Sequence, residues 1–190
     1  MEMGVLHANT FELNNIAPGI MPELVFKVDY LAGICVLYKG WLYASAIVLP
    51  TCPASEHTHT GPRVPAHLSA AGRVILAHMP QRLVHKYLDT LRDAGTEFSS
   101  EHRDEFKRDL EDIRDRGYAI KKYYAVSKQP EIISAPVFGK NGQILASLTL
   151  VSPGDGFPED KQQQLAEKLV LSAQEISQRC GHLIQAQDFV

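Results

Sequence analysis

Apolar positions near the N-terminus recur with the period of a helix. Leu24, Val28 and Leu31 fall on one side of such a helix, and polar Asn14 and Asn15 stand where an N-cap would be expected. This pattern predicts a helix that begins near residue 15 and buries one side.

The pattern then changes to strand-like runs. Segments 33–40 and 41–49 are rich in Val, Ile and Tyr, and Lys39-Gly40 between them is typical of a hairpin turn. The following segment, 51–65, is compatible with a third strand or with a long loop.

Helical and strand-like blocks follow one another in the rest of the chain. The pattern predicts helices at 66–79, 81–95 and 101–117, strands at 117–126, 131–138 and 143–152, and a final helix from Pro158 to about Gly181. Runs of strands linked by short turns, separated by a block of helices, indicate an α+β fold with an antiparallel sheet flanked by helices.

The hairpin formed by 132–151 separates its side chains into two faces. A two-residue turn pairs Ser134 with Thr149, and a four-residue loop pairs Ser134 with Ser147, but the parity is the same in both registers. One face carries Ile132, Ser134, Pro136, Ser147, Thr149 and Val151, and the other carries Ile133, Ala135, Val137, Ile144, Ala146, Leu148 and Leu150.

The purely apolar face is expected to pack on helices. The face with hydroxyls has two interpretations, a ligand pocket with a few placed polar groups or a side that faces solvent.

Composition and charge narrow the class of protein. The chain has 190 residues, 45% of them hydrophobic and 22% charged, with a net charge of -3, so it can bury a large core but lacks the basic excess of a self-sufficient DNA-binding domain. Cys35, Cys52 and Cys180 do not form a disulfide or metal-ligand spacing pattern. Because no apolar run is long enough to span a bilayer and the first fifteen residues lack the basic-then-apolar order of a signal peptide, we expect a cytoplasmic protein without membrane contact.

Candidate metal and catalytic residues are sparse. His57 and His59 would lie on the same side of a strand, and Glu56, His67, His78 and His85 could converge with them, but no further ligand motif completes a set. The sequence contains no nucleophile elbow, phosphate-binding Gly-rich loop or paired acidic motif. We therefore expect no metal, no cofactor and no enzymatic activity.

Several segments together resemble a known family. The series HLSAAGRVILAHMP, a charged helix ending in RGYAI, then ISAPVF and ASLTLVSP resembles the C-terminal effector-binding domain of IclR-type transcriptional regulators, from about Ile16 to about Gly181. The resemblance implies a GAF-like or profilin-like sheet with a small-molecule pocket, homodimers or homotetramers, and a winged helix-turn-helix domain upstream. Residues 1–15 would then be the remnant of a linker helix and 16–190 the effector-binding domain, with operator DNA bound only through the missing N-terminal domain.

The resemblance also implies which residues line the pocket. Family positions fall on Val64, Leu68, Ala70, Ala71, Gly72, Lys121, Ile132, Thr149 and Val151, to which the strand pattern adds Ser134 and Ser147. Where relatives carry an acidic group, a cysteine and a second serine, this chain has Lys121, Ile132 and Val151.

These departures suggest a different ligand. Lys121, Lys122, Tyr123 and Tyr124 would suit a carboxylate-bearing or aromatic effector, or they form an ordinary solvated edge. Two other functions stay open: a stand-alone GAF-like sensor and a cysteine-based redox enzyme, since GAF-like folds include both.

Overall fold

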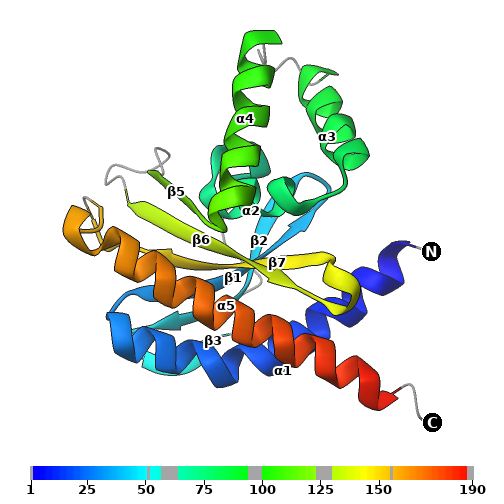
Figure 1. The fold of residues 1–190 in the computed structure, drawn as a ribbon. Coiled ribbons are helices and arrows are strands. Elements are labelled where there is room, and N and C mark those ends of the chain that lie inside the picture. The colour runs from blue at the N-terminus through cyan, green and yellow to red at the C-terminus, as the bar shows by residue number, and fades with distance from the viewer. Residues whose placement is uncertain are drawn as a thin grey trace.

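The chain folds into an antiparallel sheet with helices on both faces (Figure 1). The computed structural model describes residues 2–50, 52–56, 64–93, 100–122, 130–154 and 156–187. The helices are α1 (Glu2–Val28), α2 (Ala70–His78), α3 (Gln81–Asp93), α4 (Ser100–Arg116) and α5 (Glu159–Gln187), with 3-10 turns η1 (Ala66–Leu68) and η2 (Lys140–Gly142). The strands are β1 (Leu31–Tyr38), β2 (Trp41–Leu49), β3 (Cys52–Glu56), β4 (Val64–Pro65), β5 (Ala119–Lys122), β6 (Glu131–Phe138) and β7 (Ile144–Val151).

The sheet joins the two halves of the chain. Its order is β3-β2-β1-β7-β6-β5, with β4 also paired to β2. The first strand of the chain, β1, therefore pairs with the last strand, β7. Helices α1 and α5 cover one face, α2 lies on the other, and α3 and α4 extend outward beyond α2 (Figure 1). The predicted α+β class is confirmed, and segment 52–56 is a strand.

The first helix differs from the sequence-based prediction. Helix α1 runs through Asn14 and Asn15, which are not caps, and contains Pro18 and Pro22 in its interior. A proline removes a helical hydrogen bond, but α1 packs a continuous apolar side on the sheet and α5, and this burial outweighs the local cost. The buried side consists of Leu13, Ile16, Ala17, Ile20, Met21, Leu24 and Val25.

The two long hairpins follow the sequence pattern closely. Lys39 and Gly40 both have positive φ, 49° and 82°, as a two-residue turn with the twist of the strands requires. In the second hairpin Ser134 pairs with Thr149 and Pro136 with Ser147, which is the register predicted for the two-residue turn. The connection itself is longer, because η2 and a bulge lie between the strands.

That bulge makes one face assignment wrong. Ile144 pairs with Phe138 after the register shifts, and its side chain packs with Leu42, Ala71 and Ile75 on the α2 side. Leu145 packs against the α1 and α5 core instead. One extra residue in a strand reverses the face of everything beyond it.

The apolar face of the hairpin forms the main core. Ile133, Ala135, Val137, Leu148 and Leu150 are fully buried against α1 and α5, as predicted. Helix α5 extends to Gln187, beyond the expected end near Gly181, and buries Leu165, Leu169, Ala173 and Ile176.

None of the described helices combines the length and apolar character needed to cross a membrane.

Candidate functional site

Four small side chains lie side by side on the sheet beneath α2. Ser134, Ser147, Thr149 and Cys35 come from β6, β7 and β1, and we call them the hydroxyl face. Thr149 pairs with Ser134 on one side, and Ser147 pairs with Cys35 on the other. The Ser134 and Thr149 hydroxyl oxygens are 3.0 Å apart and share a hydrogen bond. All three hydroxyl side chains are buried, so the solvent-facing interpretation is wrong.

Ser147 is the exception within the hydroxyl face. Its Oγ is buried and makes no hydrogen bond within the described part of the chain, and the same holds for Ser45 Oγ in β2. Ser45 lies where β1 and β2 shift register, beside Cys35. A buried hydroxyl without a partner loses its hydrogen bonds to water and gains none in the protein, which costs free energy. Ser147 therefore offers an unused donor and acceptor.

Cys35 is a thiol rather than a thiolate. Burial raises its pKa to about 11, and the Thr149 hydroxyl, which can donate to the sulfur, acts in the opposite direction. A reactive cysteine needs the opposite shift, because the thiolate is the nucleophile.

The start of α2 closes over this region of the sheet. Ser69 Oγ accepts a hydrogen bond of 3.0 Å from the Gly72 N–H and so caps the helix. A Cβ atom on Gly72 would lie 2.1 Å from the Ala66 carbonyl oxygen, so this glycine is required for η1 to pack on α2. Ala70 and Ala71 are both buried.

A cluster of charges surrounds Lys121 at the end of β5. The pKa of Lys121 is lowered first by burial and then by the Arg73 guanidinium, while Asp109 and Glu105 act in the opposite direction. Arg73 forms an ion pair with Asp109, and its Nε donates a hydrogen bond of 2.8 Å to the His67 carbonyl. Among the described residues Lys121 makes no ion pair of its own.

The other positions implied by the resemblance lie around the hydroxyl face and are less buried than its three hydroxyl residues. Ile132 and Val151 are half-buried partners on β6 and β7, and Lys121 pairs with Ile132 across β5. Val64 is half-buried and packs against the cluster that contains Ala71. Leu68 is 54% exposed, so it does not join the buried part.

Two groups of candidates cannot be placed. Tyr123, Tyr124, His57 and His59 lie outside the described residues. Within the described ranges no three His, Cys, Asp or Glu side chains are grouped as a metal ion would require.

The sequence pattern does not assign two residues of this region to the site. Cys35 lies in the predicted strand 33–40, and its place on the hydroxyl face follows from its pairing with Ser147. Arg73 was not considered, because its proximity to Lys121 depends on how α2 and α4 sit over β5.

Several known proteins are similar to this chain. The HTH-type transcriptional regulator KipR of Bacillus subtilis is 24% identical over 186 residues, which cover 96% of this chain and 73% of KipR. The C-terminal domain of the Escherichia coli regulator KdgR shares 23% identity, with a TM-score of 0.73 over 90% of this chain and 99% of that domain. The inducer-binding domain of PobR from Acinetobacter, solved as a double mutant with 3-hydroxybenzoic acid, shares 19% identity, with a TM-score of 0.68 over 86% of this chain and 96% of that one.

The structural likenesses confirm the fold, and the curated relative is a transcriptional regulator. The family described as "Bacterial transcriptional regulator IclR C-terminal" matches residues 7–178, and the chain therefore belongs to this family.

Proposed function

We propose that this domain binds a small organic acid between the hydroxyl face and the start of α2, and that binding controls a transcriptional regulator. The observation that carries the proposal is Ser147, whose buried Oγ has no partner. A ligand that hydrogen-bonds to Ser147 would recover the free energy that its unpartnered hydroxyl loses on burial. The neighbouring Ser134 and Thr149 would present further hydroxyls to it.

Charge supports an acidic ligand. Burial and Arg73 disfavour the protonated form of Lys121, so a carboxylate placed nearby would be attracted to the ammonium group and would raise its pKa. The PobR domain was solved with an aromatic hydroxy acid. Hydroxybenzoates are accordingly the first ligands to test.

Ser147 allows a sharp test by calorimetry and thermal unfolding. Ser147→Ala removes a hydroxyl that has no partner, so the free energy of unfolding without ligand should stay the same or increase. The affinity of Ser147→Ala for whichever of the tested acids binds the wild type should be about fivefold to tenfold lower, which is the equivalent of one hydrogen bond. Ser172→Ala, on α5 at the other face of the sheet, is the matched control and should bind as the wild type. Equal affinity of the wild type and the Ser147 variant would refute the proposed location.

Lys121 is tested separately with a pair of ligands. Lys121→Met keeps the length of the side chain but removes its charge, so it should weaken binding of a carboxylate about tenfold. Binding of the corresponding neutral amide should not change. If acid and amide lose affinity equally, Lys121 contributes packing and not charge recognition.

Regulation through assembly is part of the proposal. A ligand can shift only an equilibrium between states for which it has different affinities, and couplings of about 1–3 kcal/mol are typical. We infer that this domain forms homodimers or homotetramers whose arrangement depends on the ligand, and that a helix-turn-helix domain in the same protein binds the operator. Light scattering of this chain with and without ligand tests the first part, and operator binding by the full-length protein tests the second.

The alternative of a cysteine-based redox enzyme has little support in the described residues. The raised pKa of Cys35 keeps its thiol protonated at neutral pH, and Cys180 is buried in α5, which covers the opposite face of the sheet. We infer a binding domain rather than an enzyme.

A further inference from the structure

A pocket lies at the far end of α2 from Ser69. It has a volume of about 620 Å³, which is in the usual range for small-molecule sites. Its walls include Leu13 of α1, Ile75 of α2, Leu83 of α3 and Ile144 of β7. None of the hydroxyl-face residues lines it, so this site is independent of the function proposed above.

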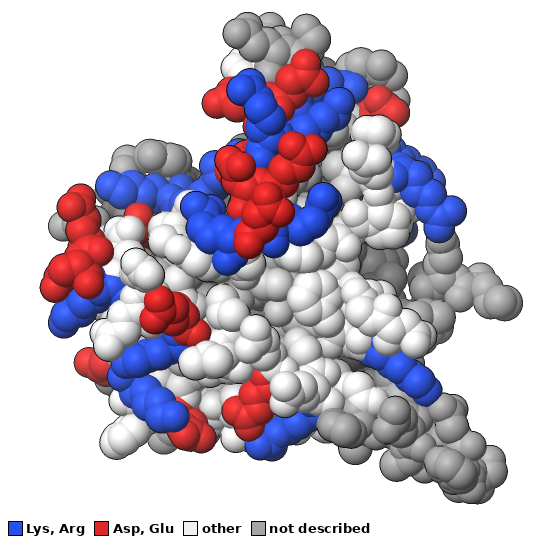
Figure 2. Space-filling view, viewed as in Figure 1, with Lys and Arg blue, Asp and Glu red and all other residues white. Residues whose placement is uncertain are grey.

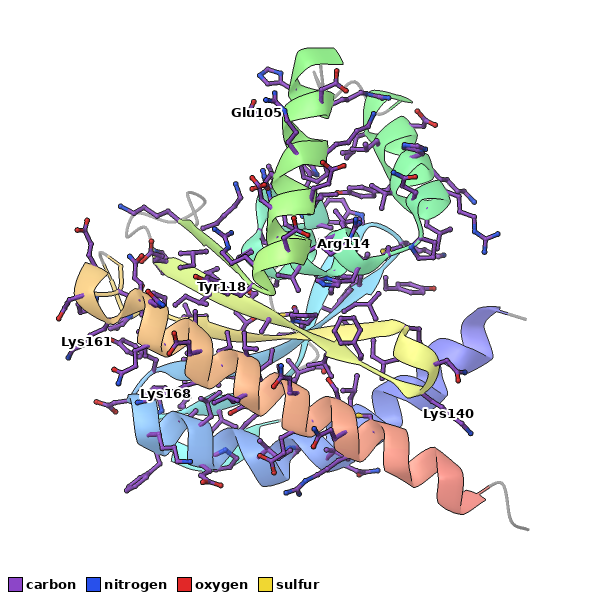
Figure 3. All side chains as sticks on the ribbon, viewed as in Figure 1. Glu105, Arg114, Tyr118, Lys140, Lys161 and Lys168 are labelled. Carbon is purple, nitrogen blue, oxygen red and sulfur yellow. The ribbon has the colours of Figure 1, made fainter. Side chains whose placement is uncertain are left out.

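Two polar side chains, His78 and Arg114, stand at the boundary of this pocket. They also line a neighbouring hollow of about 410 Å³, whose other side is formed by Pro136 and Phe138 of β6 and by α5. Figure 3 shows Arg114 at the inner end of α4, next to α2. Figure 2 shows an uncharged area of surface between this end of α4 and α5, with Lys and Arg side chains and Asp and Glu side chains interspersed along its upper border.

Arg114 is held in place but its charge is not neutralised. Its Nε donates a hydrogen bond of 2.8 Å to the Ala77 carbonyl at the C-terminal end of α2. No carboxylate among the described residues forms an ion pair with it. The terminal nitrogens of the guanidinium can therefore donate to a ligand beside the apolar walls.

His78 lies beside Arg114 and does not add a second positive charge. Its Nδ1 lies 2.9 Å from the Val74 carbonyl, and because a carbonyl can only accept, Nδ1 carries the proton. Burial, opposed by that hydrogen bond and aided by Arg114, lowers the pKa of His78. The ring is thus neutral at neutral pH, with Nε2 as an acceptor. It packs edge-on against the Phe138 ring, with the two ring centroids 5.1 Å apart.

We propose that this pocket binds an amphipathic monocarboxylate of medium size, with the carboxylate on Arg114 and the apolar part between α1, α2 and α3. Apolar walls with one unneutralised guanidinium at the rim match an apolar body with one anionic end. An occupant would touch Leu13 and Ile75 together, and so would link α1 to α2.

Titration calorimetry of the whole chain with octanoate tests this proposal. We expect octanoate to bind about tenfold more tightly than the neutral octanol, and Arg114→Met to abolish that difference. Arg116→Met is the matched control, because Arg116 stacks on Tyr118 and does not line the pocket, and it should bind octanoate as the wild type does.

A second variant tests the proposal even if the loss of Arg114 destabilises α2. Leu83 is 39% exposed, so Leu83→Glu should fold normally while placing a repelling carboxylate at the pocket, and octanoate affinity should fall about tenfold. Ser147→Ala should leave octanoate binding unchanged. The proposal is overturned if octanoate does not bind at millimolar concentration, if Leu83→Glu binds it as tightly as the wild type, or if Ser147→Ala removes the binding.

Discussion

The hydroxyls of Ser134 and Thr149 meet across β6 and β7 at 3.0 Å, and both residues are buried. Thr149 can also hydrogen-bond to the Cys35 thiol. The two hydroxyls therefore belong to one chain of polar contacts under α2, and removing either one leaves the other with fewer partners.

This relationship predicts non-additive losses of stability. Ser134→Ala and Thr149→Val should each lower the free energy of unfolding by about 1 kcal/mol. The double variant should lose less than the sum of the two, by roughly 0.5–1 kcal/mol, because the shared hydrogen bond is lost once. Urea unfolding of the four proteins measures the coupling, and strictly additive values would show that the bond does not contribute to stability.

Gly72 is predicted to be the least replaceable glycine of α2 and its surroundings. In Gly72→Ala the new methyl group would collide with backbone atoms of Ala66, at 2.1 Å from its oxygen, and backbone cannot move aside as a flexible side chain can. We expect a loss of about 2–3 kcal/mol in urea unfolding.

A second helical glycine provides the control. Gly19 lies within α1 and has no atom within 4 Å of a Cβ position, so Gly19→Ala should stabilise the protein by about 0.5–1 kcal/mol. If both substitutions had the same effect, helix propensity and not close packing would govern Gly72.

How far the sequence predicts this fold is shown by the 132–151 hairpin. Strand parity placed Ser134, Ser147 and Thr149 on one face, and parity does not depend on the rest of the molecule. Ile144 was misplaced because a bulge is set by how the turn packs, which a local pattern does not reveal. Likewise α1 continues through Pro18 because the sheet and α5 bury its apolar side, a tertiary effect that overrides local propensity.

The candidate site, like the fold, is only partly predictable from the sequence. Hydroxyls on one strand pair are visible in the sequence, whereas the lack of a partner for Ser147 depends on what α2 places above it. The environment of Lys121 depends on Arg73, Asp109 and Glu105, which come from two helices distant in sequence. Such convergence arises only from the packing of α2 and α4 on the sheet.

The pKa of Cys35 predicts a loss of stability at high pH. The folded value is about 11 against an ordinary 9.0, so as pH rises through this window the unfolded chain loses the thiol proton first and binds fewer protons than the folded chain. Stability is therefore fully present below about pH 9 and decreases toward pH 11. Cys35→Ala lacks this contribution, and the stability of the wild type relative to the variant should fall by roughly 2 kcal/mol across the window. Urea unfolding of both proteins at several pH values measures the difference, and a pH-independent difference would contradict the assignment.

The edge of β6 beyond the end of β5 is protected by Pro136 and Ser177. The Glu131 carbonyl accepts a hydrogen bond from the Ser152 N–H at the end of β7. Odd-numbered residues of β6 therefore direct their backbone groups to β7, and even-numbered residues direct theirs to the other edge. On that edge Pro136 has no N–H, and the Phe138 N–H donates to Ser177 Oγ at 2.9 Å. An edge without free donors cannot readily pair with a strand of another molecule.

Ser177→Ala should expose one donor and make this edge competent for pairing. The Ser177 hydroxyl also donates to the Ala173 carbonyl within α5 at 2.6 Å, so the variant loses one hydrogen bond that joins β6 to α5 and one inside α5, and we expect a loss of about 1–2 kcal/mol in urea unfolding. Ser177→Thr retains the hydroxyl and should behave as the wild type. Light scattering over a range of protein concentrations should show increased self-association of the alanine variant relative to the threonine variant. If the two variants associate equally, the hydrogen bond from the Phe138 N–H to Ser177 is not what prevents pairing at this edge. The absence of an N–H at Pro136 is then sufficient to prevent it.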